Sequence, residues 1–331
     1  MNYELLVIGN ERESIDEALA AARRAELVAL VQTVRFDQAL EGVSVRSSSL
    51  NRVGIAIDVL RRAKSRLGGA GPLRMSELRG VAIRIADEQW LADRSELESL
   101  GVDVFCGDVR FVDERTVEVV DRAREVSVRV ESARLRQTLA AQRILLACGT
   151  RSVRPSHVRF DSRRILDVES LLLLDELPAS MIVVGAGETG LDYAMLLGSL
   201  GVDVTVIDEK ANVFDVYGGL MNDQRLCEMQ SLDIAFRLGD EMIGVETRGD
   251  DSRDGHSVAV RLASGKVFVA QTALVCVGRV GETESLHLEA AGVGVDERGR
   301  VWCDASGGTW ASHIKAVGNI VGFRAASALA G

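Results

Sequence analysis

Features that would mark out a thiol, metal or membrane protein are missing from this 331-residue chain. Its five cysteines are scattered and form no C-x-x-C pair, so we expect reduced cysteines that fill apolar segments, with no redox disulfide and no metal site. No apolar run approaches the ~18 residues that span a bilayer, and no basic segment precedes an apolar stretch at the N-terminus. These absences predict a cytoplasmic protein without a membrane partner.

Positive charge is also in short supply. The chain has 39 lysines and arginines against 49 aspartates and glutamates, a formal net charge of −10. We therefore expect neither nucleic acid nor an anionic membrane as a partner, and a small anionic ligand must be held locally, by helix ends and backbone amides. Histidine is scarce too, and none of the four is predicted to be catalytic, because each stands alone on an expected loop or strand end: His157, His256, His287 and His313.

Residues 181–209, MIVVGAGETGLDYAMLLGSLGVDVTVIDE, are the stretch around which the chain is organised. An apolar strand leads into a turn with Gly185, Gly187 and Gly190, a helix-period segment follows, and a second apolar strand ends at Asp208. In such a turn the first glycine allows the sharp bend, the second lets backbone N–H groups approach a pyrophosphate, and the third lets the helix pack on the strand. The acid after the second strand accepts hydrogen bonds from a ribose. We predict a dinucleotide site here; the alternative is a βαβ unit that binds nothing.

Residues 1–32 predict a second βαβ unit with a degenerate ligand pattern. Of the three glycines only Gly9 remains, Glu11 and Ser14 stand at the other two positions, and Gln32 stands where the acid should end the second strand. A Glu11 carboxylate ~4 Å from a phosphate charge would repel it by about 4 kcal/mol at an effective dielectric near 20, roughly a thousandfold in affinity. We expect the fold to survive here and the ligand chemistry to be lost.

The rest of the chain alternates between helical and strand patterns. Helices are expected in residues 53–67 and 73–100. Short alternating segments at 102–107, 109–113, 116–120 and 126–130 predict a small antiparallel meander. A strand at 143–150 closes this part of the chain, and a further helix is expected at 221–231.

Two glycine-type openings, the second lying between the halves of the first domain, resemble the flavin-dependent pyridine nucleotide-disulfide oxidoreductases, in particular their soluble pyridine nucleotide transhydrogenase branch. The likeness is strong from residue 101 onward and is carried by GDVRFVDERTVEV, ILLACGTRSVRPSHVRF, ILDVESLLLLDELPASMIVVGAGETGLDYA, LASGKVFVAQTALVCVGRVGETESLHLEAAGV and IKAVGNIVGF. It implies an α/β fold with two Rossmann-like domains. The FAD-type domain would comprise residues 1–150 and 280–331, and the NAD(H)-binding domain, residues 151–279, would be inserted in it.

The resemblance implies that hydride passes between a nicotinamide cofactor and FAD. It assigns the NAD(H) site to Gly185, Gly187, Gly190, Gly278 and Asp208. The carboxylate of Asp208 favours NAD(H) over NADP(H), because it accepts from a 2′-hydroxyl but repels a 2′-phosphate.

Two acids are candidates for a place near the nicotinamide. Asp192 falls where the family carries a glutamate near that ring, and it is one methylene shorter. Glu188 stands where members of the family usually carry an apolar or aromatic residue beside the flavin. Glu188 either faces the cofactor or compensates the helix dipole.

On the flavin side the resemblance assigns Gly9 and Asn319 to FAD. The family motif A-x-G-D, whose aspartate meets the ribityl chain, appears here as residues 316–319 with asparagine in the last place. Arg52 is either near the family's lysine beside the flavin or an exposed arginine at a helix start. The family's third domain, which forms the dimer interface, has no counterpart in this sequence, so we expect a protein partner or a homodimer through another interface.

The sequence is compatible with two functions. The first is a flavin-dependent, NAD(H)-using oxidoreductase of transhydrogenase type, which the likeness and the second glycine turn favour. The second is a non-catalytic NAD(H)-binding sensor or scaffold that has lost FAD, which Glu11, Ser14, Gln32 and Asn319 favour.

Overall fold

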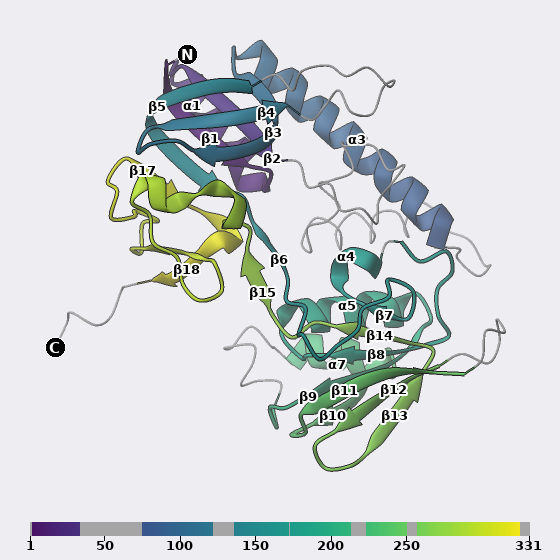
Figure 1. Cartoon of the computed structure of the whole chain (residues 1–331). Coiled ribbons are helices and arrows are strands. Elements are labelled where there is room, and N and C mark those ends of the chain that lie inside the picture. The colour runs from purple at the N-terminus through teal and green to yellow at the C-terminus, as the bar shows by residue number, and fades with distance from the viewer. Residues whose placement is uncertain are drawn as a thin grey trace.

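The computed structural model describes residues 2–33, 75–121, 136–171, 173–212, 223–249 and 257–324 (Figure 1). Within these ranges the chain forms two largely parallel sheets with helices packed on them, so the predicted α/β class is confirmed. The helix expected at 53–67, Arg52 and the last expected strand of the meander, residues 126–130, lie outside the described residues. None of the described helices is long and apolar enough to cross a membrane.

The first sheet is centred on a strand that is buried on both faces, as a central parallel strand should be. Its strands are β1 (Asn2–Gly9), β2 (Val28–Thr33), β3 (Asp103–Phe111), β4 (Thr116–Asp121), β5 (Arg136–Ala147) and β17 (Ile314–Ala316). β1 pairs in parallel with β2 and β5, and β17 pairs in parallel with β5. The two segments predicted at 102–107 and 109–113 form one strand, β3. Its first half pairs in parallel with β2, and its second half pairs antiparallel with β4.

Helix α1 (Arg12–Arg23) covers one face of this first sheet. Its buried residues Ile15, Ala18, Leu19 and Ala22 recur at helical spacing and pack against β1 and β2. The other face is covered by two short 3₁₀ helices at 284–286 and 288–291 and by β16 (Val301–Cys303), next to β18 (Val321–Arg324). We call this sheet with its covering elements the first unit.

The second sheet is fully parallel, with strand order β10-β9-β8-β14-β7. Its strands are β7 (Ile165–Leu166), β8 (Ser180–Val184), β9 (Asp203–Asp208), β10 (Ala235–Leu238) and β14 (Thr272–Val275). Helices α4 (Val168–Leu171), α5 (Glu188–Ser199) and α7 (Asp223–Ser231), the last within the helix predicted at 221–231, contribute to the core on one face. The other face packs on an antiparallel meander of β11 (Met242–Arg248), β12 (Ser257–Leu262) and β13 (Val267–Ala270). This sheet and its covering elements form the second unit.

The registers of the two units correspond around their central strands. In the first unit the residue before Gly9 pairs with the residue before Gln32. In the second unit the residue before Gly185 pairs with the residue before Asp208. The backbone pairing therefore places Gln32 where the second unit has its acid, as the sequence predicts.

A pair of short strands passes between the units (Figure 1). The chain leaves the first unit through β6 (Thr150–Ser152) and returns through β15 (Arg279–Gly281), and these two strands pair antiparallel. Helix α3 (Met75–Ser99) runs alongside both units and is about 37 Å long at 1.5 Å per residue. Its residues 81, 82 and 85 pack in the core of the second unit, whereas Leu97 packs in the core of the first. The predicted domain boundaries, which stay a prediction, would place all of this helix in the first domain.

Candidate dinucleotide sites

The turn after β8 requires glycine at two of its positions. Gly185 has a φ of +107°, and a Cβ added there would lie 2.4 Å from the carbonyl oxygen of Cys276 on the neighbouring β14 edge. A Cβ added to Gly190 would lie 1.9 Å from the carbonyl oxygen of Gly185. Because both contacts are with backbone atoms, no side-chain movement relieves them. These two glycines let α5 pack directly on the turn.

The start of α5 presents backbone N–H groups towards the same turn. Gly187 is the N-cap, its backbone is extended, and no side chain of the described residues caps the helix. The first N–H groups of an uncapped helix end, together with the positive end of its dipole, form a site suited to an anion. Glu188 is the first helical residue and is exposed, and Asp192 lies one turn later and is half-buried. Both predicted acids therefore lie on α5 at the end that meets the turn.

The Asp208 carboxylate lies against the glycine turn. One oxygen, Oδ2, accepts the backbone N–H of Ala186 at 2.6 Å, and the other, Oδ1, accepts the N–H of Lys210 at 2.8 Å. Carboxylate oxygens have more than one acceptor site each, so these bonds leave capacity for ligand hydroxyl groups.

Gly278 lies on the strand edge next to this turn. It follows β14, which pairs with β8, and has a φ of +145°. Its carbonyl oxygen accepts the N–H of Val153 at 3.0 Å, and Val153 follows directly after β6. The structure thus brings the predicted residues of the second unit together at the carboxyl ends of β8, β9 and β14, the edge where ligands bind in open α/β sheets.

The turn after β1 has the same backbone plan with different side chains. Gly9 has a φ of +149°, and a Cβ there would lie 2.0 Å from the carbonyl oxygen of Ala147, as Gly185 relates to the edge of β14. Ser14 takes the place of the third glycine; it is fully buried and its hydroxyl donates to the Glu11 carbonyl oxygen at 2.6 Å. The side-chain amide of Asn10 donates to the carbonyl oxygen of Thr33 at 2.6 Å.

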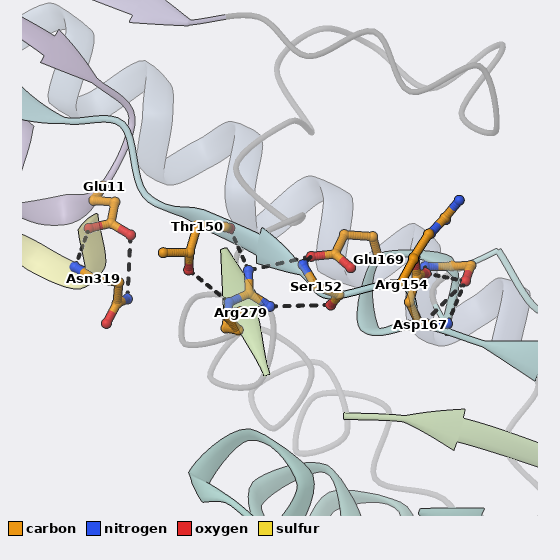
Figure 2. A network of polar contacts seen from close by, with 9 residues as sticks. Glu11, Thr150, Ser152, Arg154, Asp167, Glu169, Arg279 and Asn319 are labelled. Carbon is orange, nitrogen blue, oxygen red and sulfur yellow. Dashed lines mark hydrogen bonds and ion pairs between the residues drawn. The ribbon is translucent and has the colours of Figure 1, made fainter. Parts of the chain in front are cut away.

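Glu11 is the N-cap residue of α1, and its side chain is turned into the unit (Figure 2). The residue is only 6% exposed. Its Oε2 accepts the backbone N–H of Asn319 at 3.2 Å, and its Oε1 accepts the Asn319 side-chain amide at 3.4 Å. A Cβ added to Gly149 would lie 2.8 Å from Oε1, and one added to Gly318 would lie 2.1 Å from Oε2. The carboxylate therefore lies between two glycines that leave just enough room for it.

FAD is the cofactor that the resemblance assigns to this first unit, so the unit can be tested against its pyrophosphate. In a βαβ unit that group lies at the N-terminus of the first helix. Here a buried carboxylate lies at that end of α1, bonded to Asn319. The described residues of the first unit do not fit a pyrophosphate in this place, whereas the turn of the second unit fits one.

A polar network joins β6 and β15 where the chain passes between the units (Figure 2). The Arg279 guanidinium donates from Nε to the Thr150 hydroxyl at 2.8 Å, from a terminal nitrogen to the Thr150 carbonyl oxygen at 2.5 Å, and to the Ser152 hydroxyl at 3.4 Å. It also forms an ion pair of 3.4 Å with Glu169 of α4, whose side chain is only 9% exposed. Arg279 therefore ties both linking strands to the second unit.

Two buried polar atoms next to this network have no hydrogen-bond partner within the described residues. They are the Tyr193 hydroxyl on α5 and Oε2 of Glu169. Burial raises the pKa of Tyr193, and the nearby negative charge of Glu169 raises it further. The same two causes raise the pKa of the Cys276 thiol. Both groups are therefore neutral at physiological pH.

Asp167 anchors the start of α4 in the same region (Figure 2). Its carboxylate accepts the backbone N–H of Ser170 at 2.8 Å, accepts the Ser170 hydroxyl, and pairs with Arg154 at 2.5 Å. Burial alone would raise the pKa of Asp167, but the hydrogen bonds from Ser170 and Arg154 outweigh it and hold that pKa below its usual value.

No pattern in the sequence predicts this network. The available signal is weak: Arg279 directly follows the predicted Gly278, and Asp167 and Glu169 lie in one of the strings that carry the family resemblance. Nothing in the local pattern shows that Arg279 meets Thr150, which is 129 positions away in the chain.

A model of the pyridine nucleotide-disulphide oxidoreductase family matches residues 15–330. The chain therefore belongs to this family, as its sequence predicts.

The chain is also similar to soluble pyridine nucleotide transhydrogenases. Those of Mycobacterium bovis (strain BCG / Pasteur 1173P2) and Mycobacterium tuberculosis (strain ATCC 25177 / H37Ra) are 33% identical over 342 residues, an alignment that covers 98% of this chain and 68% of theirs. That of Pseudomonas paraeruginosa is 34% identical over 222 residues, covering 67% of this chain and 44% of its own.

Solved structures show the same fold. The Cu(II) complex of the flavoprotein disulfide reductase RclA from Escherichia coli aligns with a TM-score of 0.73 at 19% identity, covering 98% of this chain and 67% of its own. LpdA from Mycobacterium tuberculosis aligns with a TM-score of 0.71 at 23% identity, covering 96% and 68%. At these identities the likeness concerns the fold.

Proposed function

We propose that this chain binds NAD(H) in its second unit, with the pyrophosphate at the start of α5 and the adenosine ribose on Asp208. The observation that carries the proposal is the geometry of the turn. Two backbone contacts require glycine at Gly185 and Gly190, and the Asp208 carboxylate lies hydrogen-bonded against the same turn. A turn that only connected two elements would need neither an uncapped helix end nor a carboxylate beside it.

The site favours NAD(H) over NADP(H). NADP(H) differs by a 2′-phosphate on the ribose that Asp208 is proposed to hold, and Glu209 follows directly as an exposed second acid. Two carboxylates at this point repel a phosphate, whereas Asp208 accepts a hydrogen bond from a 2′-hydroxyl.

The roles of the other residues follow from their places. The N–H groups at the start of α5 bind the pyrophosphate, and the half-buried backbone at Gly278 borders the nicotinamide end of the cofactor. Asp192 and Glu188 are the acids proposed to lie nearest that end, where a carboxylate accepts an N–H of the nicotinamide amide. NAD(H), when bound, supplies the hydride chemistry, and these side chains bind and orient it.

Titration with NADH, followed by NADH fluorescence and by calorimetry, tests the proposal. We expect one NADH per chain and weaker binding of NADPH. Purified protein that binds neither nucleotide, while its circular dichroism shows a folded α/β chain, would contradict the proposal.

A second candidate function is a flavin-dependent oxidoreductase of the transhydrogenase type, which the family match over residues 15–330 favours. The visible spectrum of the purified protein separates the two. Flavin absorbance near one FAD per chain would support the oxidoreductase, and a colourless protein that binds NADH would support a sensor or scaffold. Association with a protein partner, or a homodimer through another interface, stays a prediction.

A further inference from the structure

The strongest unassigned feature is the buried acid of the first unit. Glu11 lies at the one place in this unit where a dinucleotide would need positive potential, the N-terminus of α1. Its side chain is turned away from solvent and is directed towards residues 318–319 near the other end of the described chain. An anion is thus already present at this helix end, supplied by the protein itself.

We propose that the Glu11 carboxylate is a permanent internal substitute for a cofactor phosphate in the first unit. It lies beside the start of α1 without a side-chain capping hydrogen bond to the helix, holds the segment that contains Asn319 against this helix, and closes the unit to dinucleotides. The proposal does not depend on NAD(H) binding by the second unit.

The chemistry of Asn319 supports this assignment. An amide can donate to a carboxylate, and the Asn319 side chain and backbone N–H both do so. An aspartate at this position would instead place two carboxylates within hydrogen-bonding distance of each other, which is strongly unfavourable in a buried site. Glu11 and Asn319 are therefore a matched pair, in which each residue makes the other tolerable.

The surrounding backbone is shaped to the carboxylate. Gly149 and Gly318 both have positive φ values, +77° and +74°, and a side chain at either position would collide with an oxygen of Glu11. Asn10 adds to the closure, because its amide spans from the turn to Thr33 at the end of β2, the strand whose end would carry the ribose acid. The phosphate end and the ribose end of the former site are each bridged by a side chain of the same turn.

A double-mutant cycle tests the pair, with thermal unfolding of the full chain as the measurement. Asn319→Asp in the wild-type background should lower the melting temperature by about 4 °C or more, because it faces Glu11 with a second carboxylate. The reversed pair Glu11→Gln with Asn319→Asp should recover most of that loss, since the glutamine amide now donates to the new carboxylate. Glu17→Gln, at an exposed position later in the same helix, is the matched control and should leave the melting temperature unchanged.

A second arm tests closure directly with FAD and with ADP as probes. Neither nucleotide should raise the melting temperature of the wild-type protein through the first unit, and FAD should not copurify. The triple variant Glu11→Gly, Ser14→Gly, Asn319→Asp should bind FAD at least ~10-fold more tightly than the wild type. The measurement is the amount of flavin bound by each protein at equal protein and FAD concentrations.

Three results would overturn the proposal. The first is stoichiometric FAD in the wild-type protein. The second is a reversed pair no more stable than Asn319→Asp alone, which would mean that the two side chains do not interact. The third is an unchanged FAD affinity in a triple variant that still folds. NADH affinity, measured in every variant, reports on the second unit. A wild-type protein that fails to bind NADH would contradict the proposed function but would not affect the proposal about Glu11.

Discussion

Replacing Asp208 with asparagine should weaken both ligand binding and the glycine turn. In the folded protein each carboxylate oxygen accepts one backbone hydrogen bond, from Ala186 and from Lys210. Asparagine has one acceptor oxygen where aspartate has two, so one of these N–H groups loses its partner. The variant also loses the charged acceptor proposed for the adenosine ribose.

The expected magnitudes follow from these two losses. A hydrogen bond to a charged group is worth roughly 1 to 2 kcal/mol, so the NADH dissociation constant should rise about 5- to 30-fold. The lost backbone partner should lower the free energy of unfolding by about 1 kcal/mol in the absence of ligand. Preference for NADH over NADPH should fall, because the carboxylate that repels the 2′-phosphate has been removed.

The assay is titration of wild type and variant with NADH and NADPH, next to urea unfolding without ligand. Asp203→Asn is the matched control: it lies at the opposite end of the same strand, is exposed, and should change neither quantity. If Asp208→Asn unfolds like the wild type and binds NADH within twofold of it, Asp208 does not touch the ribose, and the proposed placement of NAD(H) is wrong.

Three further changes have definite expected outcomes. Gly190→Ala should destabilise the second unit severely and abolish NADH binding, since its Cβ would lie 1.9 Å from the Gly185 carbonyl oxygen. Gly80→Ala in α3 should instead raise the free energy of unfolding by about 0.5–1 kcal/mol, because apart from its own helix backbone no atom of the described residues lies nearer than 4.0 Å to the added Cβ. Equal effects of these two substitutions on urea unfolding would refute the steric argument. Tyr193→Phe should leave stability unchanged or raise it, because the buried hydroxyl has no partner to lose among the described residues, and a drop of more than about 1 kcal/mol would reveal a hydrogen bond to that oxygen. Asp167→Asn should lower the free energy of unfolding at pH 7, and the difference from the wild type should shrink as pH falls below about 4. A carboxyl whose pKa is lowered by folding contributes stability above its unfolded pKa and loses it as pH falls through the folded pKa. A difference in unfolding free energy that does not depend on pH would mean that the charge of Asp167 does not contribute.

The second turn is predictable from sequence because each of its requirements is local. A strand, a sharp bend, a helix packed against it and an acid one strand later all leave marks within residues 181–209. The backbone contacts of Gly185 and Gly190 follow from that same stretch and the strand beside it. The α/β class and most strands are predictable for the same reason, since buried parallel strands read as apolar runs.

The destination of the Glu11 side chain is not predictable in this way. Sequence alone indicates an acid where a phosphate would lie, but its partner Asn319 is 308 positions away, and no local pattern shows that the carboxylate is held in place. The network of Arg279 is hidden for the same reason, because its partners come from β6 and α4. The length of β3 is also predicted wrongly. In the sequence, the point where this strand changes partner from β2 to β4 resembles a turn between two short strands.

The long helix α3 has a consequence for how the two halves respond to one another. The early residues of α3 lie in the hydrophobic core of the second unit, and Leu97 lies in that of the first. Local unfolding at either end of the helix therefore exposes apolar surface in the core that this end covers. Cooperativity between the halves should then be high despite their different β-architecture. Backbone amides near Leu97 should exchange with solvent more slowly once a nucleotide is bound to the second unit, because α3 links residue 81 in that core to Leu97 over about 24 Å at 1.5 Å per residue.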